Sequence, residues 1–386
     1  MKITYTSTNI AWHYRYVREL EKIGVLSHFV TGASRFSPRS RLPEIGNRLI
    51  RRDFYQNLYL LSLYLKLPPV IPNFLSLRSS KIIDNAALDP ATESDLFLFY
   101  RTTGFNTMCS IHKKKIQTIC VMEEVNTHVD CCHHLLRCEY ERLGMGSYPI
   151  SFPDHSRRLA SYDEADYILC PSTFVKQTFL DRGFSDDRIL VNNFGFSFPE
   201  YSHRKTKDDD TFRLLYVGQL HFRKGLRYAI EAFKRLKHPR KEFLIVGPST
   251  KITGLEGITI PDNIRFAGIL KGHHLEQAYA SASAFVLPTI EEGLALVQGE
   301  AMAAGLPLIT TSHSGAEDIM TDGVEGFIVP PCDSNALLDA FQYLADDPDL
   351  LRRMGVAAYY KAKGLGGWDV ATSNLTNLFR GLLISS

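Results

Sequence analysis

Two glutamates eight positions apart, Glu292 and Glu300, have the clearest potential for chemistry in this chain. A buried strand is predicted to end at Pro288, and a helix is predicted to begin near Ala295. A helix start presents free N–H groups and the positive end of the helix dipole, which together bind phosphate. A diphosphate bound there places Glu292 near a group on its far side. It also places Glu300 near ribose hydroxyls, from which a carboxylate can accept paired hydrogen bonds. The alternative is that Glu291 and Glu292 only favour the dipole and Glu300 is solvated.

The backbone at this helix start is predicted to bind the phosphates through Gly293, Leu294, Ala295, Leu296 and Val297. A second stretch, Gly218-Gln-Leu-His-Phe-Arg-Lys-Gly225, follows a predicted strand and opens a helix. Gly218 allows a tight backbone turn, and Lys224 supplies a point charge for a diphosphate, with Arg223 beside it. Alternatively, Arg223 and Lys224 are ordinary surface residues. The chain has no GxxxxGK[ST] phosphate loop, so a kinase or ATPase has no support.

The stretch Glu292-Gly-Leu-Ala-Leu-Val-Gln-Gly-Glu300-Ala-Met resembles the E-x7-E motif of the retaining, GT-B-fold glycosyltransferases of family 4, the glycosyl transferases group 1. The similarity runs from about Phe212 to Met354. Its pieces stand in family order: Tyr216-Val-Gly-Gln-Leu-His-Phe-Arg-Lys-Gly225, Phe243-Leu-Ile-Val-Gly247, Ile264-Arg-Phe-Ala-Gly268, Gly305-Leu-Pro307, Ser314-Gly-Ala-Glu-Asp318 and Asp322-Gly-Val-Glu-Gly326. The resemblance implies transfer of a sugar from a nucleotide-sugar donor, with retention at the anomeric carbon, no cofactor and no bound metal.

By the same resemblance, Glu292 contacts the donor sugar and Glu300 the ribose. The stretch Glu123-Glu-Val-Asn-Thr-His128 is similar to the place where family members put a histidine that faces the donor sugar. His128 is therefore the candidate, with a loop histidine of structural role as the alternative. One departure is Gln219, which stands where many members carry an arginine, and Arg223 is the candidate replacement for that charge.

A second departure from the family lies at the N-terminus. Family members have a Gly-Gly turn after the first strand, whereas this chain reads Ser7-Thr-Asn-Ile-Ala-Trp-His13. Close backbone approach is less favoured there without the glycines. We therefore expect the side chain of Trp12 or His13 to contact the acceptor instead.

Short apolar runs alternate with helical patterns along the whole chain, and continuous apolar runs favour strands buried on both faces of a parallel sheet. The predicted strands are Lys2–Ser7, Ser27–Thr31, Asp95–Tyr100, Gln117–Glu123, Asp166–Cys170, Arg213–Val217, Phe243–Val246, Ile264–Phe266, Ala284–Leu287 and Leu306–Thr310. This order predicts an α/β protein with two Rossmann-like, doubly wound domains that face a cleft, which is the GT-B arrangement.

The predicted organisation has four parts. Residues 1–200 form an acceptor-binding domain, residues 201–211 a polar linker, and residues 212–365 a nucleotide-sugar-binding domain. By resemblance, residues 366–386 form a helix that returns to the first domain. Length agrees with this division, because 386 residues are too many for one ordinary domain.

The composition is that of a folded protein, with 45% apolar and 22% charged residues. Seven scattered cysteines indicate reduced thiols and not a disulfide framework. No apolar stretch reaches the ~20 residues that span a bilayer, and no secretory signal is visible at the N-terminus. The expected location is cytoplasmic, with peripheral contact at the inner face of the membrane as an option.

The prediction of membrane contact comes from the uneven distribution of charge along the chain. Residues 1–80 hold twelve Lys or Arg against four Asp or Glu, although the whole chain carries a net charge of only +2. Within this part, residues 35–78 surround the apolar run FYQNLYLLSLYL. A basic, apolar surface of this kind binds anionic membranes. The alternative is a solvated face over an ordinary core helix.

A metal site is not expected. Cys131, Cys132, His133, His134 and Cys138 lack the spaced pairs of a zinc site, and adjacent helical positions point to different faces. Asp208–Asp210 is similar to a metal-binding D-x-D but lies in the polar linker, which favours a solvated turn.

The resulting function is retaining glycosyl transfer from a nucleotide sugar to a glycan, a lipid-linked glycan or another hydroxyl acceptor. Two alternatives remain open. One is a nucleotide-sugar epimerase or hydrolase on the same fold, and the other is a non-catalytic protein that binds a nucleotide sugar. No nucleic-acid partner is expected.

Overall fold

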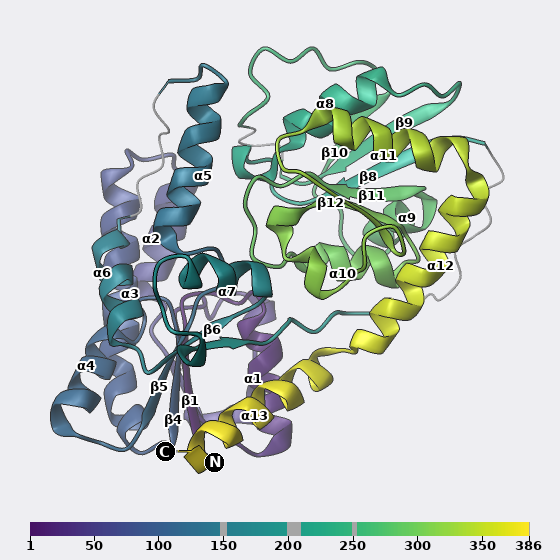
Figure 1. Ribbon diagram of the computed structural model, residues 1–386. Helices are drawn as coiled ribbons and strands as arrows, with labels where there is room; N and C mark the ends of the chain where they lie inside the picture. Colours follow the sequence, from purple (N-terminus) through teal and green to yellow (C-terminus); the bar gives the residue numbers. More distant parts are fainter. Residues whose placement is uncertain (147–152, 199–209, 249–252, 386) are drawn as a thin grey trace.

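The computed structural model describes residues 1–146, 153–198, 210–248 and 253–385. It has two α/β domains, each built on a parallel sheet with helices packed against it (Figure 1). The fold class predicted from the sequence is confirmed. Most of the predicted linker, including Asp208 and Asp209, lies outside the described residues.

The first domain contains a seven-stranded parallel sheet in the order β3-β2-β1-β4-β5-β6-β7. Its strands are β1 (Ile3–Ser7), β2 (Leu26–Thr31), β3 (Leu49–Arg51), β4 (Leu96–Tyr100), β5 (Ile119–Glu123), β6 (Tyr167–Cys170) and β7 (Ile189–Val191). Its helices are α1 (His13–Ile23), α2 (Phe54–Tyr64), α3 (Val70–Thr92), α4 (Phe105–Lys114), α5 (Val129–Arg142), α6 (His155–Glu164) and α7 (Thr173–Leu180). Helix α7 begins as the sequence predicts, because the Ser172 side chain accepts a hydrogen bond from the N–H of Val175.

The second domain contains a six-stranded parallel sheet in the order β10-β9-β8-β11-β12-β13. Its strands are β8 (Phe212–Val217), β9 (Lys241–Val246), β10 (Ile264–Gly268), β11 (Ala284–Leu287), β12 (Leu308–Thr311) and β13 (Gly326–Val329). Its helices are α8 (Leu226–Arg235), α9 (His273–Ser281), α10 (Leu296–Ala303), α11 (Ser334–Asp346) and α12 (Pro348–Leu365), with a short 3-10 helix η4 (Phe222–Lys224) before α8.

The last helix, α13 (Trp368–Ser385), packs on α1 of the first domain. The rings of Trp368 and Tyr16 meet edge to face, with their centroids 5.2 Å apart. Figure 1 shows α12 beside the second domain and α13 running back along the first. The chain therefore ends on the domain in which it begins.

Three strands were not predicted from the sequence, namely β3, β7 and β13, and each lies at the edge of its sheet. These three strands have only three or four residues and are partly exposed, and apolar runs as short as Ile189–Val191 do not distinguish a strand from part of a helix. Every residue of β4 and of β11, by contrast, is buried.

The apolar run predicted either as a membrane contact or as a core helix is helix α2. At the far end of this helix Leu61, Leu63 and Tyr64 are 49%, 48% and 82% exposed, and both the membrane contact and the solvated face stay predictions. Helix α3 packs against α2, and its second half reaches the sheet at β1 and β2.

Candidate functional site

The predicted donor residues gather where strands β8 and β11 end. Helix α10 begins at Leu296, one residue after the predicted start, so Gly293, Leu294 and Ala295 form the loop that leads into it. Glu291 and Glu292 are buried in that loop. Lys224 and Arg223 approach them from η4, which follows β8. The structure thus brings together two stretches that are about 70 residues apart in sequence.

A compact cluster of opposite charges results. The Nζ of Lys224 contacts Oε2 of Glu292. One guanidinium nitrogen of Arg223 lies 3.1 Å from Oε2 of Glu291 and 3.4 Å from Oε1 of Glu292. Burial alone raises the pKa of Glu292, but the charges of Arg223 and Lys224 lower it to about 2. Glu292 is therefore ionised at neutral pH.

Gly225 allows the stretch with Arg223 and Lys224 to lie close to the loop with Glu291 and Glu292. Its φ is +62°, and a Cβ there would lie 1.9 Å from the carbonyl oxygen of Pro288, so only glycine fits. The N–H of Ile290 then donates to the carbonyl of Arg223 at 2.9 Å and ties the two loops together. Gly218 lies at a bend directly after β8, without a positive φ.

Glu300 lies in the second turn of α10, on a partly buried face. The hydroxyl of Tyr279, on α9, donates to its Oε2 at 3.1 Å. Burial raises the pKa of Glu300 above its ordinary value of 4.5, whereas the Tyr279 hydrogen bond and the charge of Arg15 act in the opposite direction. Arg15 is exposed on α1, so a cation of the first domain acts on the second.

The first domain closes on this loop through its own loop after β5. The carboxylate of Glu291 accepts hydrogen bonds from the N–H and the hydroxyl of Thr127, at 3.0 and 2.9 Å. A Cβ on Gly293 would lie 1.7 Å from the carbonyl oxygen of Val125. Ser172 adds a hydrogen bond to the carbonyl of Gly293 at 2.7 Å. Gly293 is therefore required by the contact between the domains.

His128 is close to this contact in sequence, but its ring lies in the core of the first domain. The ring packs 4.9 Å from that of Tyr162 and 5.2 Å from that of Phe179, measured between centroids. Its Nδ1 accepts from the N–H of Asp130 and caps α5. Burial lowers the pKa of His128 to about 4, so the ring is neutral at pH 7. This placement matches the structural alternative, and a role at the donor sugar stays a prediction.

The candidate acceptor residues Trp12 and His13 belong to a buried network at the carboxyl ends of β1 and β5. Glu123 accepts from the Trp12 indole at 2.7 Å and from the Tyr5 hydroxyl at 2.6 Å. His13 is fully buried, with Nδ1 2.6 Å from the Tyr5 hydroxyl, and its Nε2 has no hydrogen-bond partner within the described part of the chain. Only Trp12 presents a partly exposed surface, so the expected direct contact of His13 with an acceptor does not fit this arrangement.

Four residues at the site were given no role there from the sequence: Glu291, Tyr279, Arg15 and Glu123. Glu291 stands next to the predicted Glu292, but two acidic residues before a helix start also fit the helix dipole alone. Nothing in the sequence distinguishes Tyr279 or Arg15 from other residues of their helices. Their positions follow from packing alone.

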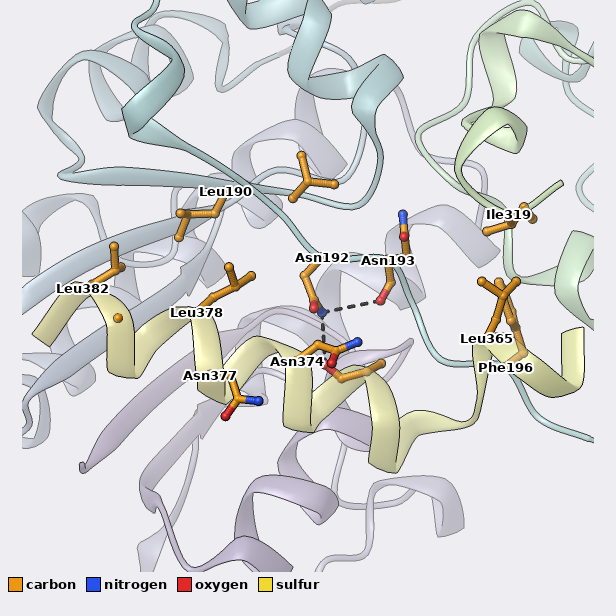
Figure 2. A pocket seen from close by; sticks show the side chains of 13 residues that line it. Leu190, Asn192, Asn193, Phe196, Ile319, Leu365, Asn374, Asn377, Leu378 and Leu382 are labelled. Atoms are coloured by element: carbon orange, nitrogen blue, oxygen red, sulfur yellow. Dashed lines mark hydrogen bonds between the residues drawn. The ribbon is translucent and has the colours of Figure 1, made fainter. Parts of the chain in front are cut away.

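Two other features lie away from this site. A cavity of about 700 Å³ lies between α13 and residues 190–196, where the chain passes from one domain to the other (Figure 2). Neither Lys224 nor either of Glu292 and Glu300 lines it. Within the described ranges, His112, Cys120 and Asp166 could together hold a metal ion. They gather where β5 and β6 begin, whereas the loop of Glu123 to His128 follows the other end of β5.

Comparison with known proteins indicates the class of protein to which the chain is similar. Residues 197–361 match the family model described as glycosyl transferases group 1. The putative colanic acid biosynthesis glycosyltransferase WcaL of Salmonella typhimurium is 31% identical over 168 residues, which cover 40% of this chain and 41% of that protein. The glycogen synthase of Mycobacterium tuberculosis is 34% identical over 198 residues, which cover 50% and 48%. These matches support a place in the glycosyltransferase superfamily. The chain spans less than half the length of these two relatives.

Two solved structures align with nearly the whole of this chain. The sucrose-phosphate synthase of Thermosynechococcus elongatus aligns over 100% of both chains with a TM-score of 0.73 and 19% identity. The Anabaena protein HepE, in complex with UDP-glucose, aligns over 99% of this chain and 100% of its own with a TM-score of 0.66 and 15% identity. At these identities the likeness is one of fold, and the fold is GT-B.

Proposed function

We propose that this protein is a retaining glycosyltransferase of family 4 that transfers a sugar from a nucleotide-sugar donor to a hydroxyl acceptor. The acceptor class is a glycan, a lipid-linked glycan or another hydroxyl compound, in polysaccharide or glycoconjugate biosynthesis. The family match and the name of the WcaL relative support this class of activity. The UDP-glucose bound to HepE, which shares this fold, supports a nucleotide sugar as the donor.

The observation that carries the proposal is the buried charge cluster before α10. Lys224 and Arg223 are cations at a helix start, where the dipole already favours an anion. Their carboxylate partners, Glu292 and Glu291, compensate them in the absence of another anion. A diphosphate offers the same cations stronger, charge-assisted hydrogen bonds.

In the proposed mechanism, Lys224, Arg223 and the N–H groups from Gly293 to Val297 hold the leaving diphosphate. Glu292 turns to a hydroxyl of the donor sugar, and Glu300 accepts from the ribose hydroxyls. Departure of the diphosphate makes the anomeric carbon electron-poor, and the acceptor oxygen attacks from the face that the diphosphate leaves. A phosphate oxygen takes the acceptor proton, which gives retention without a protein nucleophile. The two cations neutralise the leaving group without a metal ion.

The decisive test measures thermal stabilisation of wild-type protein by UDP-, GDP- and ADP-sugars, followed by product analysis with the stabilising donor. A ligand at 100 times its dissociation constant stabilises by about 2.7 kcal/mol. Glu300→Gln should lose most of this shift. Glu93→Gln, an exposed residue of the first domain, is the matched control and should keep it. NMR of the glycoside product then reports whether the anomeric configuration is retained.

The remaining alternatives separate in the same experiment. An epimerase or hydrolase consumes the stabilising donor without an acceptor and forms no glycoside. A non-catalytic binding protein is stabilised by the donor and leaves it unchanged under all conditions.

A further inference from the structure

The tip of the helix hairpin α2–α3 has an unusually apolar surface. Eleven of the twenty-one exposed large apolar side chains of the described residues lie within residues 54–77. Tyr64 and Val70 are 82% and 77% exposed, and every residue from 63 to 71 is exposed. Exposed apolar clusters of this kind mark interaction surfaces in folded proteins.

The hairpin extends beyond the sheet on which it packs. Helix α3 has 23 residues, or about 34 Å at 1.5 Å per residue, whereas the following strand β4 has five residues, or about 17 Å. Ile83, Ala87 and Ala91, in the second half of α3, are fully buried. The first half therefore projects past the sheet at the carboxyl ends of its strands, since α3 returns to the start of β4. Figure 1 shows α2 and α3 side by side on this domain.

The charges around the tip are almost all positive. Lys66 is the only charged residue from 54 to 77, and exposed Arg52 and Arg78 flank this segment. The guanidinium of Arg78 lies 5.2 Å from the ring centroid of Phe74. Asp53, the acidic residue that directly precedes this segment in sequence, is buried and forms an ion pair with Arg35. The hairpin therefore has Lys66 within its apolar end, and Arg52 and Arg78 form a basic collar at its base.

We propose that this tip docks on an anionic lipid surface, with its apolar side chains among the acyl chains and Arg52, Lys66 and Arg78 at the headgroups. Consecutive exposed residues from 63 to 71 point to all sides of the tip. A protein partner or a second copy of the chain covers one face of a hairpin, whereas a lipid layer surrounds its end. The basic collar matches a negative headgroup layer. No helix among the described residues is long and apolar enough to cross a bilayer.

Not every arginine of this region is available for lipid. Arg48 pairs with Glu21 at 2.5 Å, and Arg51 donates to the carbonyls of Ala33 and Ser40. Replacing these two would disturb the fold. Arg52, Lys66 and Arg78 are the cations that test docking.

The experiment is vesicle co-sedimentation of the full chain at low and physiological salt. Vesicles of phosphatidylcholine with phosphatidylglycerol are compared with vesicles of phosphatidylcholine alone. The combined variant Arg52→Gln, Lys66→Gln and Arg78→Gln should bind anionic vesicles roughly 100-fold more weakly at low salt. Its control replaces three exposed cations of α12, Arg352→Gln, Arg353→Gln and Lys363→Gln, and should bind like wild type.

The apolar contribution is tested by Leu63→Ser, Tyr64→Ser and Val70→Ser together. These side chains are exposed, so the variant should fold, and its vesicle binding should fall at least ~10-fold. Val356→Ser with Tyr360→Ser on α12 is the matched control. Added fluorescence from Tyr64→Trp should be quenched by lipids brominated on their acyl chains, which shows insertion.

Three results would overturn the proposal. They are wild-type protein that stays in the supernatant with anionic vesicles at low salt, tip variants that bind as well as wild type, and controls that lose binding equally. If light scattering shows a dimer that the apolar variant dissociates, and vesicles bind nothing, the tip is an interface between copies. None of these outcomes depends on sugar transfer.

Discussion

Glu291 of the second domain accepts two hydrogen bonds from Thr127 of the first, at 3.0 Å from the N–H and 2.9 Å from the hydroxyl. The same carboxylate is 3.1 Å from Arg223, which also faces Glu292. One buried side chain thus joins the contact between the domains to the charges of the candidate donor site. We infer that closure of the domains and the arrangement of these charges are coupled through Glu291.

Thr127→Val should weaken this contact. The change keeps the shape and the backbone donor but removes the hydroxyl, and a lost hydrogen bond to a carboxylate costs about 1.5–3 kcal/mol. Urea denaturation should show this loss in the free energy of unfolding, and small-angle scattering should show a larger radius of gyration. Thr92→Val, whose hydroxyl bonds only within α3, is the control. Equal behaviour of the two variants would show that Thr127 does not hold the domains together.

Glu292→Gln should lower turnover far more than affinity for a nucleoside diphosphate. The carboxylate is assigned to the donor sugar, and losing one electrostatic contact at a reacting group costs ~10²–10³ in rate. Lys224, freed from its partner, should hold the diphosphate at least as well as before. Calorimetric titration with UDP or GDP and steady-state kinetics measure the two effects. Equal losses in both would assign Glu292 to the nucleotide.

Glu300→Gln should weaken binding of the nucleoside diphosphate and change how this binding depends on pH. A lost charge-assisted hydrogen bond costs about 1.5–3 kcal/mol at neutral pH. Because burial raises the pKa of Glu300, the wild-type carboxylate takes up a proton at a higher pH than an exposed one and then loses its acceptor sites. Wild-type affinity should therefore fall as the pH decreases towards that pKa.

The two pH profiles must be compared with each other, because the phosphate of the ligand also titrates, near pH ~6. That titration is common to wild type and Glu300→Gln, so only the difference between them reports on Glu300. Parallel profiles would remove Glu300 from the ribose site.

His128→Phe should reduce stability and leave turnover near that of wild type. The new ring keeps the packing on Tyr162 and Phe179 but loses the cap of α5, which costs about 1 kcal/mol. The pKa of His128 falls from an ordinary 6.5 to about 4 in the fold, so the unfolded chain binds this proton first. Wild-type stability should decline as the pH falls from 6.5 towards 4, and the variant should lack this part of the decline. A folded variant without transferase activity would support the role at the donor sugar that the sequence predicts for His128.

The central strands were predictable because a parallel sheet covered on both faces needs continuous apolar segments. The runs at 96–100 and 284–287 meet this requirement and form β4 and β11. The edge strands β3, β7 and β13 have three or four residues and are partly exposed, and the pattern of so short an apolar run does not distinguish a strand from part of a helix. Lys224 and Glu292 could be nominated because each stands next to a glycine turn at a predicted helix start.

The sequence by itself determined the order of strands and helices and the chemistry of the donor loop, since both depend on residues close together in the chain. Only the tertiary structure decided which distant residues meet. Trp12 and Glu123 are separated by 111 positions, and Thr127 and Glu291 by 164, so their contacts arise from strand order and from docking of the domains. Exposure follows the same rule. The sequence did not decide how much of the apolar run in α2 is covered, and the far end of this helix is exposed because the hairpin extends past the sheet.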